Sequence, residues 1–184
     1  MGNKSTTKKM VLLSILVALG VVFSLADGFI TTAIVSSMPF LAYVIPAGFK
    51  IGLANVVILI IVLNFRFKDG LITVILKSTL VSFIFGSPIT FAIGFTGTIL
   101  SFLTMYGIKK LSKKDPDVVV TSLFGAVAHT VGQIVGAGVF AFYGWGVLGL
   151  IPQTLSIALI AGFFMGVIAK SINTYLQNSY LLLD

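Results

Sequence analysis

The sequence predicts an all-α polytopic membrane protein, a single transmembrane domain over residues 1–184 with six membrane-spanning helices. Of the 184 residues, 58% are hydrophobic and 9% are charged, whereas a soluble domain carries about 25% charged residues. The mean hydropathy is +1.14. Because a span needs about 20 apolar residues, the chain has room for about six spans with short loops. No separate soluble domain fits.

Apolar runs and the residues that interrupt them place the spans at 10–27, 48–65, 69–86, 88–109, 118–142 and 147–170. The pair Asp27-Gly28 is interpreted as the stop of the first helix. Residues 66–70 form a polar turn before the third, and Pro88 opens the fourth. Asp115-Pro116-Asp117 supplies an N-cap and a first-turn proline for the fifth. Residues 143–146 place aromatic side chains at the interface before the sixth.

The segment 28–47 joins the first two helices and is apolar, with prolines at 39 and 46. It is too short for two further spans. A long apolar connection of this kind predicts an extracellular lid or a re-entrant plug. The alternative is a segment that lies on the lipid headgroups.

Ten of the twelve Lys and Arg residues fall on one side if six spans alternate: Lys4, Lys8, Lys9, Arg66, Lys68, Lys109, Lys110, Lys113, Lys114 and Lys170. The positive-inside rule then predicts a multi-pass protein of the cell membrane with both termini in the cytoplasm. For the cluster 109–114, the alternative role is binding anionic lipid headgroups. Since topology explains the basic residues, the net charge of +7 does not indicate a nucleic-acid partner.

Several chemistries are disfavoured by what the chain lacks. It has no cysteine and one histidine, so thiolate sites are excluded and a metal site is not expected. Prenyl transfer needs aspartate-rich motifs that hold Mg²⁺, and the nearest pair, Asp115 and Asp117, flanks a proline in a basic loop. A phosphate-binding G-x-x-x-x-G-K-[ST] loop is absent, so the chain is not itself an ATPase. We expect no catalytic residue and no cofactor.

Lys77 lies near the middle of the apolar stretch 70–86. A charge at that depth costs about 2.5 to 3.5 kcal/mol on insertion scales. The predicted topology places all five aspartates near a membrane surface or in the tail, which leaves Lys77 without an acidic partner. An anionic ligand is therefore the favoured counterpart, and the alternative is a structural role with carbonyl or water oxygens.

Polar residues from mid-depth to the outer side predict a pocket that opens outward. Its candidate substrate-binding residues are Lys50, Asn55, Lys77, His129, Gln133 and Gln153. Alternatives stay open: Lys50 can snorkel to water or pair with Asp27, and His129 can bond between helices or relay protons. Surrounding Phe, Tyr and Ala favour a small organic anion with an apolar body, such as a vitamin or an isoprenoid or quinone precursor.

Small residues mark the helix contacts. Gly132-x3-Gly136, on the face of the fifth helix that carries His129, and Gly162-x3-Gly166 predict close packing. Ser14, Ala18 and Val22 form a ridge of small residues on the first helix. Such a ridge either packs inside the bundle or docks an external partner.

Three stretches together resemble the Gx transporter family, often labelled heptaprenyl diphosphate synthase component I: FKIGLAN at 49–55, FGSP at 85–88 and GAVAHTVGQ at 125–133. The similarity covers about residues 10–170. That family is similar to the substrate-binding S components of energy-coupling factor (ECF) transporters. The resemblance implies six helices, an outward-facing site and a first extracellular loop that acts as a lid.

The resemblance also implies partners. Ser14 and Ala18 would contact a transmembrane coupling subunit joined to two cytoplasmic ATPases, although a serine stands here where those proteins usually have an alanine. Ligand capture would be followed by closure and by toppling of the subunit in the bilayer. The alternatives are a non-catalytic membrane subunit of a polyprenyl diphosphate synthase complex and a solitary secondary carrier. Against the carrier, we find no convincing internal repeat and expect no intramembrane carboxylate. A purely structural protein would have no need of Lys77.

Overall fold

The computed structural model describes residues 2–43, 50–85, 87–112, 115–140 and 144–178, and the regular structure within these ranges is helical. The elements are α1 (Gly2–Ser37), η1 (Pro39–Tyr43), α2 (Asn55–Asn64), α3 (Phe67–Phe85), α4 (Pro88–Leu111), α5 (Val118–Phe140), η2 (Trp145–Leu150) and α6 (Ile151–Asn178). Four segments are long and apolar enough to cross a membrane: Thr7–Ser37, Pro88–Leu111, Val118–Phe140 and Gly146–Asn178. The all-α membrane bundle predicted from the sequence is confirmed.

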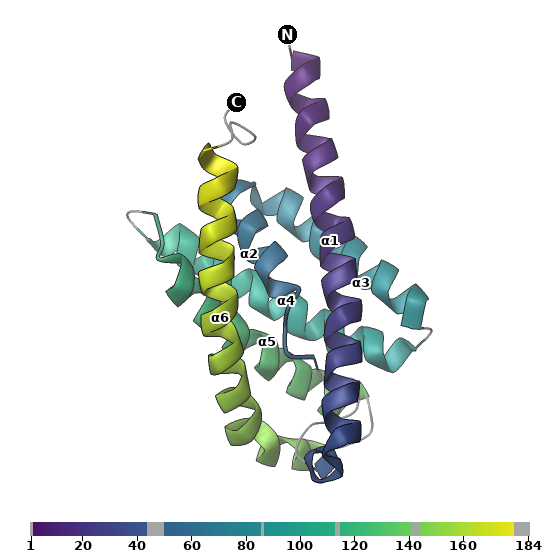
Figure 1. Ribbon diagram of the computed structural model, residues 1–184. Helices are drawn as coiled ribbons and strands as arrows, with labels where there is room; N and C mark the ends of the chain where they lie inside the picture. The colour runs from purple at the N-terminus through teal and green to yellow at the C-terminus, as the bar shows by residue number, and fades with distance from the viewer. Residues whose placement is uncertain (1, 44–49, 86, 113–114, 141–143, 179–184) are drawn as a thin grey trace.

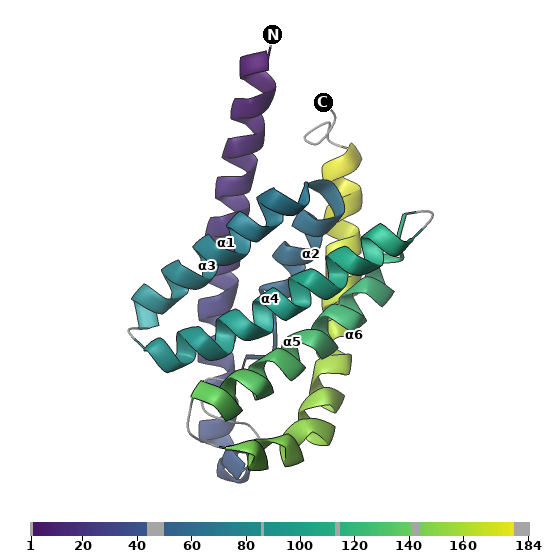
Figure 2. The same ribbon diagram turned by 180° about the vertical axis from the view of Figure 1, so that it is seen from behind.

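The helices form two layers around α2. α1 and α6 run in opposite directions along one face, where each packs against α2, and both termini lie at the same end of the bundle (Figure 1). Figure 2 shows α3, α4 and α5 running obliquely across the opposite face. α2 has only 10 residues, and its residues 55–62 are all buried. Because α2 is apolar all round and enclosed by other helices, it forms the core that the longer helices cover.

Glycines set the close approach of α4, α5 and α6. A Cβ on Gly132 would lie 2.6 Å from the carbonyl oxygen of Thr96, and one on Gly166 would lie 2.9 Å from Cα of Val119. Backbones can meet this closely only where no side chain intervenes. The predicted packing roles of both glycine pairs are confirmed.

The predicted end of the first helix is wrong. α1 continues through Asp27 and Gly28 to Ser37. The Asp27 side chain turns inward and is 1% exposed, and Gly28 leaves room for the Phe85 ring, whose Cζ would lie 2.9 Å from an added Cβ. Interior packing at both positions outweighs the modest helix penalty of Asp and Gly.

The longer α1 also alters the predicted connection at 28–47, because the first part of that segment is helical. Residues 28–37 belong to α1, residues 39–43 form η1, and the remainder of the predicted lid lies outside the described residues. The second helix begins at Asn55 rather than at 48. Residues 50–54 precede it as a non-helical segment in which Gly52 has φ +103°, a conformation that glycine adopts without steric cost.

The other predicted spans agree with the helices to within a few residues at most of their ends. α6 is the exception, because it begins at Ile151 after η2 and continues to Asn178. α3 is shorter than the four candidate spans and carries three charged residues, Lys68, Asp69 and Lys77. The six predicted helices are all present, and four of them meet the criteria for a span by length and composition.

Large apolar side chains are exposed on the outward surfaces of the bundle. Examples are Ile15, Leu19 and Val22 on α1, Ile72 and Leu76 on α3, and Ile160, Phe163 and Phe164 on α6. An apolar surface of this extent is unfavourable in water and suits contact with lipid.

Segments that carry basic residues contact one another or their neighbours near the end of the bundle where both termini lie. Lys9 of α1 forms an ion pair with Asp69 of α3, with Nζ 2.8 Å from Oδ2. Lys109 of α4 donates to the carbonyl of Val62 at 2.6 Å. The segments around residues 9, 66–69 and 109 therefore lie together, as the alternation of six helices predicted.

Candidate functional site

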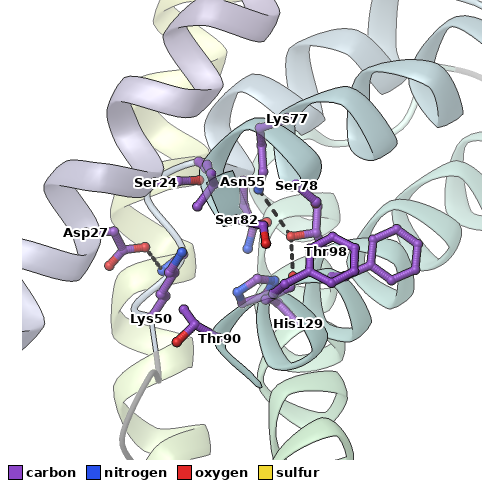
Figure 3. A pocket seen from close by; sticks show the side chains of 16 residues that line it. Ser24, Asp27, Lys50, Asn55, Lys77, Ser78, Ser82, Thr90, Thr98 and His129 are labelled. Atoms are coloured by element: carbon purple, nitrogen blue, oxygen red, sulfur yellow. Dashed lines mark hydrogen bonds between the residues drawn. The ribbon is translucent and has the colours of Figure 1, made fainter. Parts of the chain in front are cut away.

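A polar pocket lies where α1, the segment 50–54, α3, α4 and α5 meet (Figure 3). Its empty volume is about 420 Å³, which includes space open to the surroundings of the protein. The lining residues are Ser24, Asp27, Lys50, Gly52, Ala54, Asn55, Lys77, Ser78, Val81, Ser82, Thr90, Phe91, Gly94, Phe95, Thr98 and His129. Four of the six predicted substrate-binding residues are among them: Lys50, Asn55, Lys77 and His129.

Lys77 of α3 is 5% exposed, and its ammonium group is directed into this pocket. Its Nζ donates to Oγ1 of Thr98 on α4 at 3.1 Å. Thr98 donates in turn to the carbonyl of Gly94 at 2.7 Å. The aliphatic stem packs against α1 where Gly20 leaves space, with 3.4 Å between an added Cβ and Cγ of Lys77. A neutral hydroxyl accepts a hydrogen bond from the ammonium group and leaves its charge uncompensated.

Asp27 lines the pocket, whereas the predicted topology placed it near the membrane surface. Its carboxylate accepts backbone N–H bonds from Ile51 at 2.8 Å, Gly52 at 2.7 Å and Leu53 at 3.0 Å. These bonds hold the segment 50–54 against α1. The signal available in the sequence was a single carboxylate between the apolar run before it and the apolar residues that follow it.

Lys50 is 8% exposed at the opposite side of the pocket from Thr98. Its Nζ lies 5.0 Å from the centroid of the Phe85 ring, a cation–π distance. Within the part of the chain that the structure describes, neither Lys50 nor Lys77 forms an ion pair with a carboxylate. The alternative in which Lys50 forms a salt bridge with Asp27 is therefore wrong.

Gln133 positions Lys50 and does not line the pocket. Its Oε1 accepts the Lys50 backbone N–H at 2.7 Å, and its Nε2 donates to the Lys50 carbonyl at 2.9 Å. The side chain is 1% exposed. Sequence periodicity placed Gln133 on the correct face of α5, but the chain's own backbone uses its amide.

His129 and Asn55 supply polar atoms that the described part of the protein leaves without a partner. Both residues are buried, at 4% and 5% exposed. Oδ1 of Asn55 and Oγ of Ser78 form no hydrogen bond to any described residue. The ring nitrogens of His129 form no hydrogen bond of good geometry, although the ring lies against the backbone of Gly97. Buried polar atoms are nearly always hydrogen-bonded, so these atoms indicate a site built to meet a polar guest.

Aromatic rings form the apolar wall of the pocket. Phe91 and Phe95 of α4 stack with their centroids 5.5 Å apart and their planes 22° apart. Their role was anticipated only in general terms, because the 16 phenylalanines of the chain give no indication of which ones meet.

The remaining predicted residues lie elsewhere. Gln153 is exposed near the start of α6 and does not line the pocket. Ser14 and Ala18 are exposed on α1, on a face that also presents Val22. The Ser14 hydroxyl donates a hydrogen bond to the Met10 carbonyl of the same helix at 2.9 Å. The ridge therefore presents a largely apolar surface.

The electrostatic balance of the pocket is positive. It contains the ammonium groups of Lys50 and Lys77 and the carboxylate of Asp27. The described residues hold no group of three or more metal-ligating side chains. The arrangement is suited to binding an anion.

Comparison with protein families gives a match over most of the chain. The model described as heptaprenyl diphosphate synthase component I matches residues 25–172, in agreement with the resemblance found in the sequence. No curated protein and no solved structure matches the chain.

Proposed function

The chain belongs to the heptaprenyl diphosphate synthase component I family, and we propose that it is the solute-binding membrane subunit of an ECF-type importer for a small organic anion. The observation that carries the proposal is the pocket itself. Two buried ammonium groups and one carboxylate face a hollow among helices that suit a membrane. A protein keeps such a charge excess in a membrane when a ligand compensates it.

Further support comes from the unpartnered polar atoms and the aromatic wall. His129 and Asn55 offer hydrogen bonds that the described residues do not use. Phe91 and Phe95 offer an apolar surface beside them. A ligand with an anionic head and an apolar body satisfies both features, whereas a purely structural bundle gains nothing from either.

The exposed ridge on α1 supports an external partner. Ser14 and Ala18 are exposed on the outer surface rather than packed within the bundle. Small residues let a second helix approach closely in lipid. In the proposed mechanism this ridge contacts a transmembrane coupling subunit, ATP hydrolysis in two cytoplasmic ATPases drives the cycle, and toppling of the subunit delivers the solute inward.

The first test removes the Lys77 charge. We expect the wild-type protein to be stabilised thermally by millimolar phenylacetate, a small aromatic anion, and the Lys77→Met variant to lose that shift while eluting as a folded protein. The matched control is Lys110→Met, which removes an exposed lysine outside the pocket. An equal shift in Lys77→Met and the wild type would contradict the assignment of the pocket.

The family's printed description favours a second candidate, a non-catalytic membrane subunit of a heptaprenyl diphosphate synthase. Co-purification separates the two. An importer subunit recovers a coupling subunit and ATPases, and we expect Ala18→Leu to reduce that recovery severalfold while anion binding persists. Ala33→Leu serves as control on an exposed position of the same helix. Recovery of a soluble prenyltransferase instead would establish the second candidate.

A further inference from the structure

We propose that the pocket selects a monoanionic head, a carboxylate rather than a phosphate ester or diphosphate, on a planar apolar body. This inference rests on the proposed function of the same site. It concerns the chemical class of the ligand, which the sequence alone did not decide. Three features of the pocket carry it: its charge count, its backbone N–H groups and its aromatic wall.

The charge count favours one negative charge. When both lysines are protonated and Asp27 is ionised, these three lining residues contribute two positive charges and one negative charge. His129 beside two ammonium groups is counted as neutral. The pocket therefore carries a net charge of +1. A monoanion brings the buried site to neutrality, whereas a phosphate dianion leaves a charge without compensation in a medium of low dielectric constant.

The described backbone between residues 50 and 57 offers no cradle for a phosphate. Phosphate sites typically use free N–H groups at a helix N-terminus or in a loop. Here the N–H of Lys50 donates to Gln133, and those of residues 51–53 donate to Asp27. The N–H groups of residues 55–57, at the start of α2, donate to the carbonyls of residues 52–54 at 2.9 to 3.2 Å. The N-terminus of α2 is thus already used by the protein.

What remains for the ligand is a set of side chains. The two ammonium groups suit a carboxylate, and the stacked rings of Phe91 and Phe95 suit a planar apolar body. Oδ1 of Asn55 accepts but has no described donor. A ligand that also carries a hydroxyl or amine hydrogen would satisfy it.

The test compares three probes of nearly equal shape on the purified full chain: phenylacetate, phenyl phosphate and 2-phenylacetamide. At pH 7.5 phenyl phosphate is mainly a dianion, since the second pKa of a phosphate ester is about 6. We expect phenylacetate to bind at least ten times more tightly than phenyl phosphate. The neutral amide should give no measurable binding.

A variant tests the charge count without changing the shape of the pocket. Asn55→Asp lowers the net charge from +1 to zero. It should fold, because Asn55 is the first residue of α2 and an acidic side chain is favourable at a helix N-terminus. We expect its affinity for phenylacetate to fall at least tenfold, and Asn178→Asp, at the exposed end of α6, to bind as the wild type does.

The outcomes separate the inference from the proposed function. Phenyl phosphate binding as tightly as phenylacetate, with both lost in Lys77→Met, would overturn the carboxylate preference and leave an anion-binding subunit. Unchanged phenylacetate binding in Asn55→Asp would overturn the charge count. Wild-type protein that binds neither anion would overturn both proposals.

Discussion

At the scale of single residues, the groups around the Lys77 ammonium group decide how far its charge is compensated. Thr98 accepts one hydrogen bond from it, and the carboxylate of Asp27 is engaged by three backbone N–H groups. Asp27 therefore reduces the positive potential of the pocket without neutralising either lysine as an ion pair. The site keeps its attraction for an anion while part of the electrostatic cost is relieved.

Gln133 leads to a prediction about stability. Gln133→Leu removes both hydrogen bonds to the Lys50 backbone and leaves a buried N–H and a buried C=O unpaired. An unpaired buried group costs about 1 to 3 kcal/mol. We therefore expect a thermal unfolding midpoint several degrees below that of the wild type, measured in detergent.

The matched control for this change is Gln153→Leu. Gln153 is exposed and its amide lies against two carbonyls of η2, so the midpoint should hardly move. Equal stability of Gln133→Leu and the wild type would show that the amide does not hold the segment 50–54 in place.

The sequence identified a charged residue inside an apolar helix, but it did not identify the residues with which buried polar side chains form hydrogen bonds. Lys77 was identifiable because a lysine in an apolar run is costly. Asp27 was misplaced, because Asp-Gly after an apolar run is typical of a helix stop, and its true partners lie 24 to 26 residues further along the chain. Helical periodicity placed Gln133 on the same face of α5 as His129. It could not show that the Gln133 amide would form hydrogen bonds with the Lys50 backbone.

At the scale of helices, α1 and α2 depart most from the prediction. α1 has 36 residues and at 1.5 Å per residue is about 54 Å long, well beyond the roughly 30 Å of a hydrocarbon core. α2 has 10 residues. An apolar window does not distinguish a short buried helix from part of a span, so the sequence could not show that residues 50–54 are non-helical.

The C-terminal end of α2 gives the element-scale prediction. Nζ of Lys109 donates to the carbonyls of Val62 at 2.6 Å and Leu63 at 2.9 Å, which a helix end otherwise leaves without partners. From the sequence alone, Lys109 is one of several basic residues that set the topology. We expect Lys109→Met to lower the free energy of unfolding by about 1 kcal/mol or more, the range for a hydrogen bond to a charged group that is partly exposed to solvent.

Lys110→Met is the control, because Lys110 is exposed and carries the same charge one residue later. Chemical or thermal unfolding of the two variants separates capping from loss of charge. If both variants unfold alike, the contact with α2 contributes nothing measurable and Lys109 serves topology alone.

At the scale of the whole molecule, the arrangement of charges along the bundle is the feature that the sequence predicted best. Alternation of six helices placed ten basic residues on one side. The structure joins Lys9 to Asp69 and Lys109 to the end of α2, at the end where both termini lie (Figure 1). The helix count and the gathering of charge were predictable because both follow from hydropathy and spacing. The tilt of α3, α4 and α5 was not, because it depends on which glycine faces meet.

The orientation of the bundle in the cell membrane is the remaining prediction, and the sequence offers a clean way to test it. The chain has no cysteine, so a single introduced thiol gives an unambiguous label. Lys110→Cys lies at the basic end, and Gly149→Cys lies in η2, exposed and with no atom within 4 Å of an added Cβ. We expect a membrane-impermeant maleimide to label Gly149→Cys in intact cells, and Lys110→Cys only after permeabilisation, because basic segments stay in the cytoplasm. The reverse pattern would place the basic end outside and would exclude capture of an external solute by the orientation proposed for this pocket.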